Sequence, residues 1–260
     1  MLGVTTTADL SLVRSRGEEW RTLAFMPAAA LWREFLDADV LRLWDGWLNR
    51  PLVEDIRSAG REIWVMSGNL GSYLPTGVFD PARVALYREL GVDGVLVNEV
   101  SRFRRVLARG GYPRLIAHRG LCPGLCREFA SRFAAAKALG ADEIELDVRG
   151  TADRHLVICH DRDLARIAGI PGSIDALGVE QLAAARLRGD MESVGLCTLE
   201  EVFRLLGQSI GYNIHIKEAG DDGWIVARTI RTIREYALQR IAYIAGDAEV
   251  LDYAMRMDPE

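Results

Sequence analysis

The chain has 260 residues, of which 49% are hydrophobic and 27% charged, values typical of a globular protein that buries a sizeable core. Its net charge of −5 excludes a global basic field for nucleic acid or an anionic membrane, so an anionic ligand needs a local cluster of cations. The N-terminal segment lacks the features of a secretory signal, and no apolar run reaches the ~20 residues of a membrane-spanning helix. We therefore expect a cytoplasmic protein without a membrane span or a nucleic-acid partner.

Strand-like apolar runs alternate with helix-like runs along most of the chain, which is typical of parallel strands joined by helical crossovers. In chain order the runs are RTLAFMP (21–27), VLRLWDGW (40–47), REIWVMSGN (61–69), VDGVLVNE (92–99), RLIAHRG (114–120), EIELDV (143–148), HLVICHD (155–161), YNIHIKE (212–218) and RIAYIAGD (240–247). LGVT (2–5) is a further strand or an edge piece. Because an α/β barrel has eight strands, we expect one or two runs to form a side hairpin, and LVICHD is our choice.

Four helices are predicted between these runs. Asp80–Leu90 has Asp80 as a candidate N-cap with Pro81 behind it, and Gly91 ends it. Arg127–Leu139 is rich in alanine and is followed by Gly140. Thr198–Leu206 begins with the capping-box pair Thr198 and Glu201, and Asp221–Leu238 is a longer amphipathic candidate.

The spacing of turns and cysteines predicts one domain with reduced thiols. ARGGYP (108–113) is the nearest candidate for a linker, and it is too short for an interdomain tether. The four cysteines, Cys122, Cys126, Cys159 and Cys197, form neither a CxxC pair nor a zinc-finger pattern. A bridge between Cys122 and Cys126 is the alternative.

Polar residues gather at the ends of the apolar strands in the second half. His118 and Arg119 end RLIAHRG, and His160 ends LVICHD. Two pairs lie two residues apart, and each pair therefore shares one face of its strand: Glu145 with Asp147, and His215 with Lys217. In a parallel barrel the carboxyl ends of the strands surround one mouth, where active sites lie.

Taken singly, each of these residues has an ordinary structural explanation: a strand-end histidine, a solvated carboxylate pair or a surface lysine. Taken together they favour a site, because two carboxylates on one buried face need a cation. Carboxylates suit Mg²⁺ or Ca²⁺. Arg119 and Lys217 could then hold a phosphate, and two histidines could act as acid and base.

Residues 113–218 resemble the glycerophosphodiester phosphodiesterase family in the order and spacing of LIAHRG, GADEIELDVRGTADRHLVICHD, TLEEVF and NIHIK. The resemblance implies a TIM barrel that hydrolyses a small-molecule phosphodiester to glycerol 3-phosphate and an alcohol, in lipid metabolism. By it, His118 and His160 are the acid/base pair, and Arg119 and Lys217 contact the phosphate. Glu145 and Asp147 are metal ligands with His215 as the third.

The first 112 residues resemble the same family's C-terminal half, through ADVLRLWDGWL (38–48), SAGREIWVMSGN (58–69) and LGVDGVLVNE (90–99). Trp64 would then face the apolar part of the substrate at the mouth. Because the late strands come first, we expect a single circularly permuted barrel over residues 1–260, whose two termini lie close together. The alternative is a swapped dimer or another homo-oligomer in which a neighbouring chain completes the barrel.

The chain departs from the family pattern at three places. Arg127, Glu128 and Phe129 stand where Glu-Asn-Thr is usual, and Asn98-Glu99 replaces Thr-Asp. His215 replaces a glutamate, so the bound ion could be Mn²⁺ or Zn²⁺ as well as Mg²⁺ or Ca²⁺. These changes leave open a lyase or synthase acting on a sugar or lipid phosphodiester, or a non-catalytic phosphodiester-binding barrel.

Overall fold

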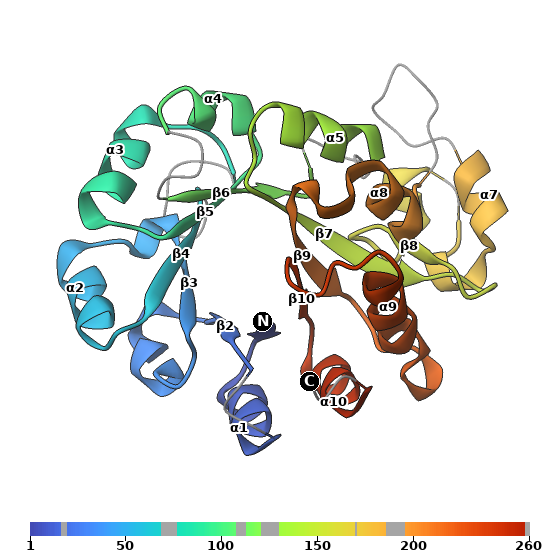
Figure 1. The fold of residues 1–260 in the computed structure, drawn as a ribbon, viewed down its shortest axis with the longest axis horizontal. Helices are drawn as coiled ribbons and strands as arrows, with labels where there is room; N and C mark the ends of the chain where they lie inside the picture. The colour runs from blue at the N-terminus through green and yellow to red at the C-terminus, as the bar shows by residue number, and fades with distance from the viewer. Residues whose placement is uncertain are drawn as a thin grey trace.

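The strands of this chain close into a ring with helices around its outside in the computed structural model (Figure 1). The structure describes residues 1–16, 20–68, 77–107, 113–120, 130–169, 171–185 and 196–257. Cys122, Cys126 and the segment 127–129 lie outside the described residues, so the predictions made for them remain predictions. Cys159 and Cys197 are buried and carry thiols rather than a disulfide.

In the described part of the chain, nine parallel strands form the ring in the order β6, β5, β4, β3, β2, β1, β10, β9, β7, and β7 pairs back onto β6. Their bounds are β1 Leu2–Val4, β2 Thr22–Phe25, β3 Val40–Trp44, β4 Glu62–Met66, β5 Gly94–Val97, β6 Arg114–His118, β7 Glu143–Gly150, β9 Gly211–Ile216 and β10 Ala242–Ala245. The predicted closed parallel barrel is confirmed.

The ring has one strand more than the eight predicted. LGVT supplies β1, in which Leu2 lies opposite Thr22 of β2 and Ile244 of β10. A Cβ atom at Gly3 would lie 2.6 Å from the Cβ of Ala245, so only glycine lets the strand fit here. A strand of three residues is too short to display alternation, which is why the sequence does not reveal its place.

The side hairpin is confirmed. β8 (Leu156–Ile158) pairs antiparallel with β7 and takes no part in closing the ring. The chain reverses between the two strands through Thr151, which hydrogen-bonds His155. The hairpin leaves His160 just past β8, on the same side as the carboxyl end of β6.

Helices follow most of the strands and cover the ring from outside (Figure 1). The α-helices are α1 Thr7–Arg16, α2 Arg50–Ser58, α3 Pro81–Leu90, α4 Val100–Arg104, α5 Ala130–Ala138, α6 Leu164–Ile167, α7 Val179–Ala184, α8 Leu199–Leu206, α9 Trp224–Glu235 and α10 Ala248–Met257. Short 3₁₀ turns are η1 Ala29–Phe35, η2 Asp45–Trp47, η3 Ile174–Ala176, η4 Gly207–Ser209 and η5 Asp221–Gly223. Blue α1 and red α10 lie side by side where the ring closes.

The predicted helix ends are largely confirmed. Asp80 caps α3, and Gly91 ends that helix in the left-handed conformation at φ 69°. Thr198 and Glu201 form the predicted capping box of α8. The last predicted helix begins later than expected, at Trp224, because Asp222 and Gly223 have positive φ and interrupt it.

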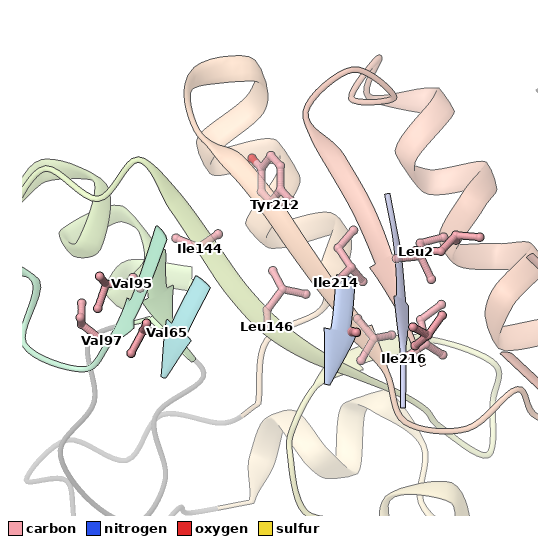
Figure 2. Packing of buried hydrophobic residues seen from close by; sticks show 14 of the residues in the cluster. Leu2, Val65, Val95, Val97, Ile144, Leu146, Tyr212, Ile214 and Ile216 are labelled. Carbon is pink, nitrogen blue, oxygen red and sulfur yellow. The ribbon is translucent and has the colours of Figure 1, made fainter. Parts of the chain in front are cut away.

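Alternate residues of the strands build two apolar layers. The outward-facing side chains pack beneath the helices, and Figure 2 shows part of this layer, with Ile144 and Leu146 of β7 beside Tyr212, Ile214 and Ile216 of β9. The opposite faces fill the inside of the ring with a smaller cluster. Its buried members are Leu23, Val40, Trp64, Met66, Leu96 and Ile116.

Among the described residues, no helix is both long and apolar enough to cross a bilayer.

Candidate active site at the carboxyl ends of the strands

Three neighbouring strands bring the predicted polar residues together. His118 at the end of β6 lies opposite Glu145 of β7, and Asp147 of β7 lies opposite His215 of β9. Glu145 and Asp147 alternate with Leu146, whose side chain packs outward in the main core. Both carboxylates therefore point into the ring, as the sequence predicts, and both are buried.

Glu145, Asp147 and His215 form a cluster in which one candidate ligand atom from each residue lies within 4.8 Å of the others. Both oxygens of Asp147 are buried, and Lys217 and Arg119 are the cations that lie against them. A buried carboxylate needs positive charge beside it, and a divalent cation would supply such charge to all three residues of the cluster. The three residues fit a metal ion by position and by chemistry.

The two carboxylates differ in their pKa. Burial and the neighbouring Asp147 raise the pKa of Glu145 to about 8. Burial also acts to raise the pKa of Asp147, but His215, Lys217 and Arg119 outweigh it and hold that pKa far below its usual range. Asp147 is the more acidic carboxyl group of the pair.

The two predicted phosphate contacts both lie against Asp147. Nζ of Lys217 is 2.8 Å from one carboxylate oxygen and Nε of Arg119 is 3.1 Å from the other. Arg119 has φ 51°, an uncommon conformation for a residue with a side chain. Its backbone N–H donates to Glu145 at 3.1 Å. The strained turn after β6 thus places a cation and a donor over the carboxylates.

The two predicted catalytic histidines have different partners. Nδ1 of His118 lies 3.0 Å from Oδ1 of Asn98, whereas Nδ1 of His160 lies 2.8 Å from a carboxylate oxygen of Asp161. Burial, together with the charge of Arg119, lowers the pKa of His118 to about 3. Burial also lowers the pKa of His160, but Asp147 and Asp161 act against it. His118 is the neutral ring, and His160 is the one that a carboxylate helps to protonate.

Trp64 does not take the predicted place at the mouth. Its side chain is 1% exposed, its ring meets Tyr243 with centroids 6.1 Å apart, and Gly94 leaves space for it. It fills the inside of the ring, and the partly exposed rings packed against it are Trp44 on β3, Phe25 on β2 and Tyr243 on β10. The strand register explains the difference, because Trp64 lies two residues before the end of β4, whereas Trp44 is the last residue of β3.

Two residues near the cluster are not predicted as site residues from the sequence. Asn98 contacts His118, so the exchange of the family's Thr-Asp for Asn98-Glu99 bears directly on the site. Arg42 lies inside the ring on β3, and its charge acts on both Glu145 and His118. A signal for Arg42 is present in the sequence: it shares a strand face with Val40 and Trp44 in VLRLW.

Comparison with known proteins agrees with this geometry. Residues 118–236 match the sequence model of the glycerophosphoryl diester phosphodiesterase family. A glycerophosphodiester phosphodiesterase of Caldanaerobacter subterraneus subsp. tengcongensis is 32% identical over 142 residues, which cover 51% of this chain and 57% of the relative. A probable glycerophosphodiester phosphodiesterase 1 of Mycobacterium tuberculosis is 38% identical over 72 residues, covering 28% of this chain and 26% of the relative. The chain thus spans little more than half the length of the first relative.

Solved structures show the same fold over a similar share of the chain. A glycerophosphodiester phosphodiesterase from Agrobacterium tumefaciens has a TM-score of 0.50 at 21% identity and covers 55% of this chain and 62% of its own. A phosphodiesterase from Oleispira antarctica was solved with its product sn-glycerol-3-phosphate. It has a TM-score of 0.51 at 23% identity, and the match covers 57% of this chain and 63% of the Oleispira chain. At these identities the likeness concerns the barrel alone.

Proposed function

We propose that this chain, whose residues 118–236 belong to the glycerophosphoryl diester phosphodiesterase family, hydrolyses a glycerophosphodiester to glycerol 3-phosphate and an alcohol. One observation carries the proposal. His118 contacts Asn98 and lies opposite Glu145, and His160 contacts Asp161 and directly follows Cys159, whose N–H donates to the Asp147 carbonyl, so both histidines adjoin the strand that carries the buried carboxylates. Two cations lie against the same carboxylate.

The chain's own residues would divide the reaction as follows. With its Nδ1–H donated to Asn98, His118 keeps a lone pair on Nε2 and removes the proton of the attacking hydroxyl. The attacking group is the glycerol hydroxyl next to the diester, which forms a cyclic phosphate. His160, held through Nδ1 by Asp161, gives a proton to the leaving alcohol. Water then opens the ring with the two roles exchanged.

Arg119 and Lys217 would bind the phosphate oxygens. Both pair with Asp147 when no ligand is present, and both lie close enough to turn to an anion above it. A divalent cation held by Glu145, Asp147 and His215 would add Lewis-acid charge at the phosphate. Mg²⁺ or Ca²⁺ suits the carboxylates, and the imidazole admits Mn²⁺ or Zn²⁺.

The permuted order is part of the proposal. Residues 1–112 would supply the late strands of the family and residues 113–260 the early ones, within one chain. The pairing of β1 with β10 supports this reading, because it closes the ring without a second chain. The structural matches support it as well, since each covers 55–57% of this chain. A sequential alignment with an unpermuted barrel can follow only one of the two halves.

The experiment is a product assay. Glycerophosphocholine and glycerophosphoethanolamine are incubated with the protein and Mg²⁺, Ca²⁺, Mn²⁺ or Zn²⁺, and glycerol 3-phosphate is measured. We expect release with at least one metal, and a loss of about 10²–10⁴-fold in His118→Ala and His160→Ala. Accumulation of the cyclic phosphate would identify a lyase. Tight binding of the diester without any product would mean that the chain is a non-catalytic, diester-binding barrel.

A further inference from the structure

Arg42 lies inside the ring, where its neighbours are aromatic. On β3 it alternates with Leu41 and Leu43, which pack outward beneath the helices. In the strand register Arg42 lies opposite Phe25 of β2 and Trp64 of β4. Its side chain is 7% exposed. A guanidinium at this depth belongs to the lining of the barrel and not to the protein surface.

Among the described residues, this guanidinium lies over the faces of two aromatic rings. Its central carbon lies 4.4 Å from the ring centroid of Trp44 and 5.1 Å from that of Phe25. Its Nε has no hydrogen-bond partner among the described residues. Burial lowers the pKa of Arg42 to about 10, and the charge of Glu145 acts against that shift. A buried cation in this state is costly unless an anion joins it.

Two more buried donors inside the ring share this state. The indole N–H of Trp64 and the hydroxyl of Tyr243 have no hydrogen-bond partner within the described part of the chain. Their rings touch across the barrel from β4 and β10. Arg42 lies beside Trp64 on the adjacent strand. Unsatisfied donors gathered in one place indicate a guest that carries acceptor oxygens.

We propose that Arg42 is the anion-binding residue of a subsite inside the ring, which receives a second oxyanion of the substrate, a phosphate or carboxylate on its alcohol moiety. The inference rests on the proposed function and narrows its substrate class. The diester phosphate already has Arg119 and Lys217, both anchored at Asp147. Arg42 forms no ion pair with a carboxylate of the described residues, although the charge of Glu145 acts on it, and its guanidinium lies among aromatic side chains.

The first test measures anion binding without catalysis. In EDTA-treated protein inorganic phosphate can reach Arg42 and also Arg119 and Lys217, which pair with Asp147 at rest. The calorimetric titration therefore compares Arg42→Gln with Arg119→Gln, so that binding at the two places is told apart. We expect saturable binding that weakens at least about tenfold in Arg42→Gln and returns in part in Arg42→Lys, since one charge-assisted hydrogen bond is lost or replaced. Undiminished binding in Arg42→Gln overturns the proposal.

Arg33→Gln is the matched control. The Arg33 guanidinium lies over the Trp32 ring at 4.4 Å, the same distance as in the Arg42–Trp44 pair, but its side chain is 66% exposed on η1. The Arg33→Gln variant should bind phosphate with the affinity of the wild type. Arg42→Met separates binding from folding, because replacing an unpaired buried cation with an apolar chain should leave the melting temperature unchanged or raise it. A clear drop would make Arg42 a structural residue and overturn the proposal.

The second test compares glycerophosphoinositol with glycerophosphoinositol 4-phosphate, which differ by one oxyanion. The wild type should have the higher kcat/KM for the 4-phosphate, and Arg42→Gln should lose at least about tenfold more on it than on the other diester. An equal loss on both would mean that Arg42 binds the diester phosphate itself, which contradicts the proposal. If neither diester is hydrolysed, the proposed function fails, whereas the phosphate titration still tests the subsite.

Discussion

The two sides of the barrel interior are built from different chemistry. The side formed by β7 and β9 carries charge, with Glu145, Asp147, His215 and the nearby Lys217. The side formed by β2, β3 and β4 carries rings, and Arg42 is the cation among them. By our proposal the charged side binds a metal and the diester phosphate. The aromatic side would shape the space beside them and, through Arg42, select what enters.

The contrast has an energetic side. Buried carboxylates and unsatisfied donors lower the stability of a fold, whereas buried rings raise it. The charged side therefore depends on the aromatic side and on the core beneath the helices for its geometry. Substitutions on the charged side should change binding more than folding, and substitutions of the fully buried rings on the aromatic side should do the reverse.

The largest effect is expected at Asp147 on the charged side. Asp147→Asn removes the more acidic carboxylate of the cluster and should weaken Mn²⁺ binding by at least about 100-fold, beyond the loss seen for outer-shell partners. The rise in melting temperature on adding metal should vanish with it. Isothermal titration and thermal unfolding with and without metal measure both.

Asp252→Asn is the control for this change. Asp252 lies on α10, where it pairs with Arg16 and Arg256 at the surface. It should keep the affinity of the wild type. Equal Mn²⁺ affinity in Asp147→Asn and wild type would show that the metal does not bind at Asp147.

The next largest effects are expected at the two tryptophans of the aromatic side, where alanine should lower stability at Trp64 and raise KM at Trp44. Trp64→Ala empties a fully buried site and should lower the free energy of unfolding by about 3–5 kcal/mol. Trp44→Ala, at a partly exposed ring, should cost less stability and raise KM instead. Urea denaturation and steady-state kinetics separate the two. A Trp64→Phe variant with normal stability and a strongly raised KM would show that Trp64 contacts the substrate at the mouth.

The smallest effect is expected far from both sides, at Asp39. Its carboxylate accepts from the Thr22 N–H at 2.7 Å and pairs with Arg14 at 2.9 Å, which ties β2 to the segment before β3. Burial acts to raise the pKa of Asp39, but Thr22 and Arg14 outweigh it and lower that pKa. The stabilisation is therefore present above the unfolded pKa, near ~3.9, and is lost as pH falls through the lower folded value.

Asp39→Asn should accordingly cost about 1 kcal/mol at pH 7, and the difference from the wild type should shrink towards about pH 3. Denaturant titrations at the two pH values measure it. Mn²⁺ affinity should not change. A stability difference between wild type and Asp39→Asn that grows on acidification would contradict the lowered pKa of Asp39.

The sequence predicts the charged side well and the aromatic side poorly. Polar residues at the ends of apolar strands are conspicuous, and alternation fixes their face, so Glu145, Asp147 and His215 are found without the structure. Trp64 is misplaced because depth inside a barrel depends on the stagger of neighbouring strands, which no single strand displays. Asn98 is missed as a partner of His118 because their contact joins two strands.

The ninth strand is hidden for a related reason. β1 has three residues, and its place depends on Gly3 fitting against Ala245 and Phe25, which come from the two neighbouring strands. Such packing is a property of the closed ring. The alternation of strands and helices predicts that a ring exists, and the number of strands in it follows from side chains that meet only after folding.

The central claim is that His118 and His160 act on one phosphodiester. The most direct measurement follows glycerophosphocholine by phosphorus NMR in the presence of metal, with wild type, His118→Ala and His160→Ala at equal concentration. The account predicts that the diester signal gives way to glycerol 3-phosphate with the wild type and persists with each variant. Conversion at the wild-type rate by either variant would contradict it.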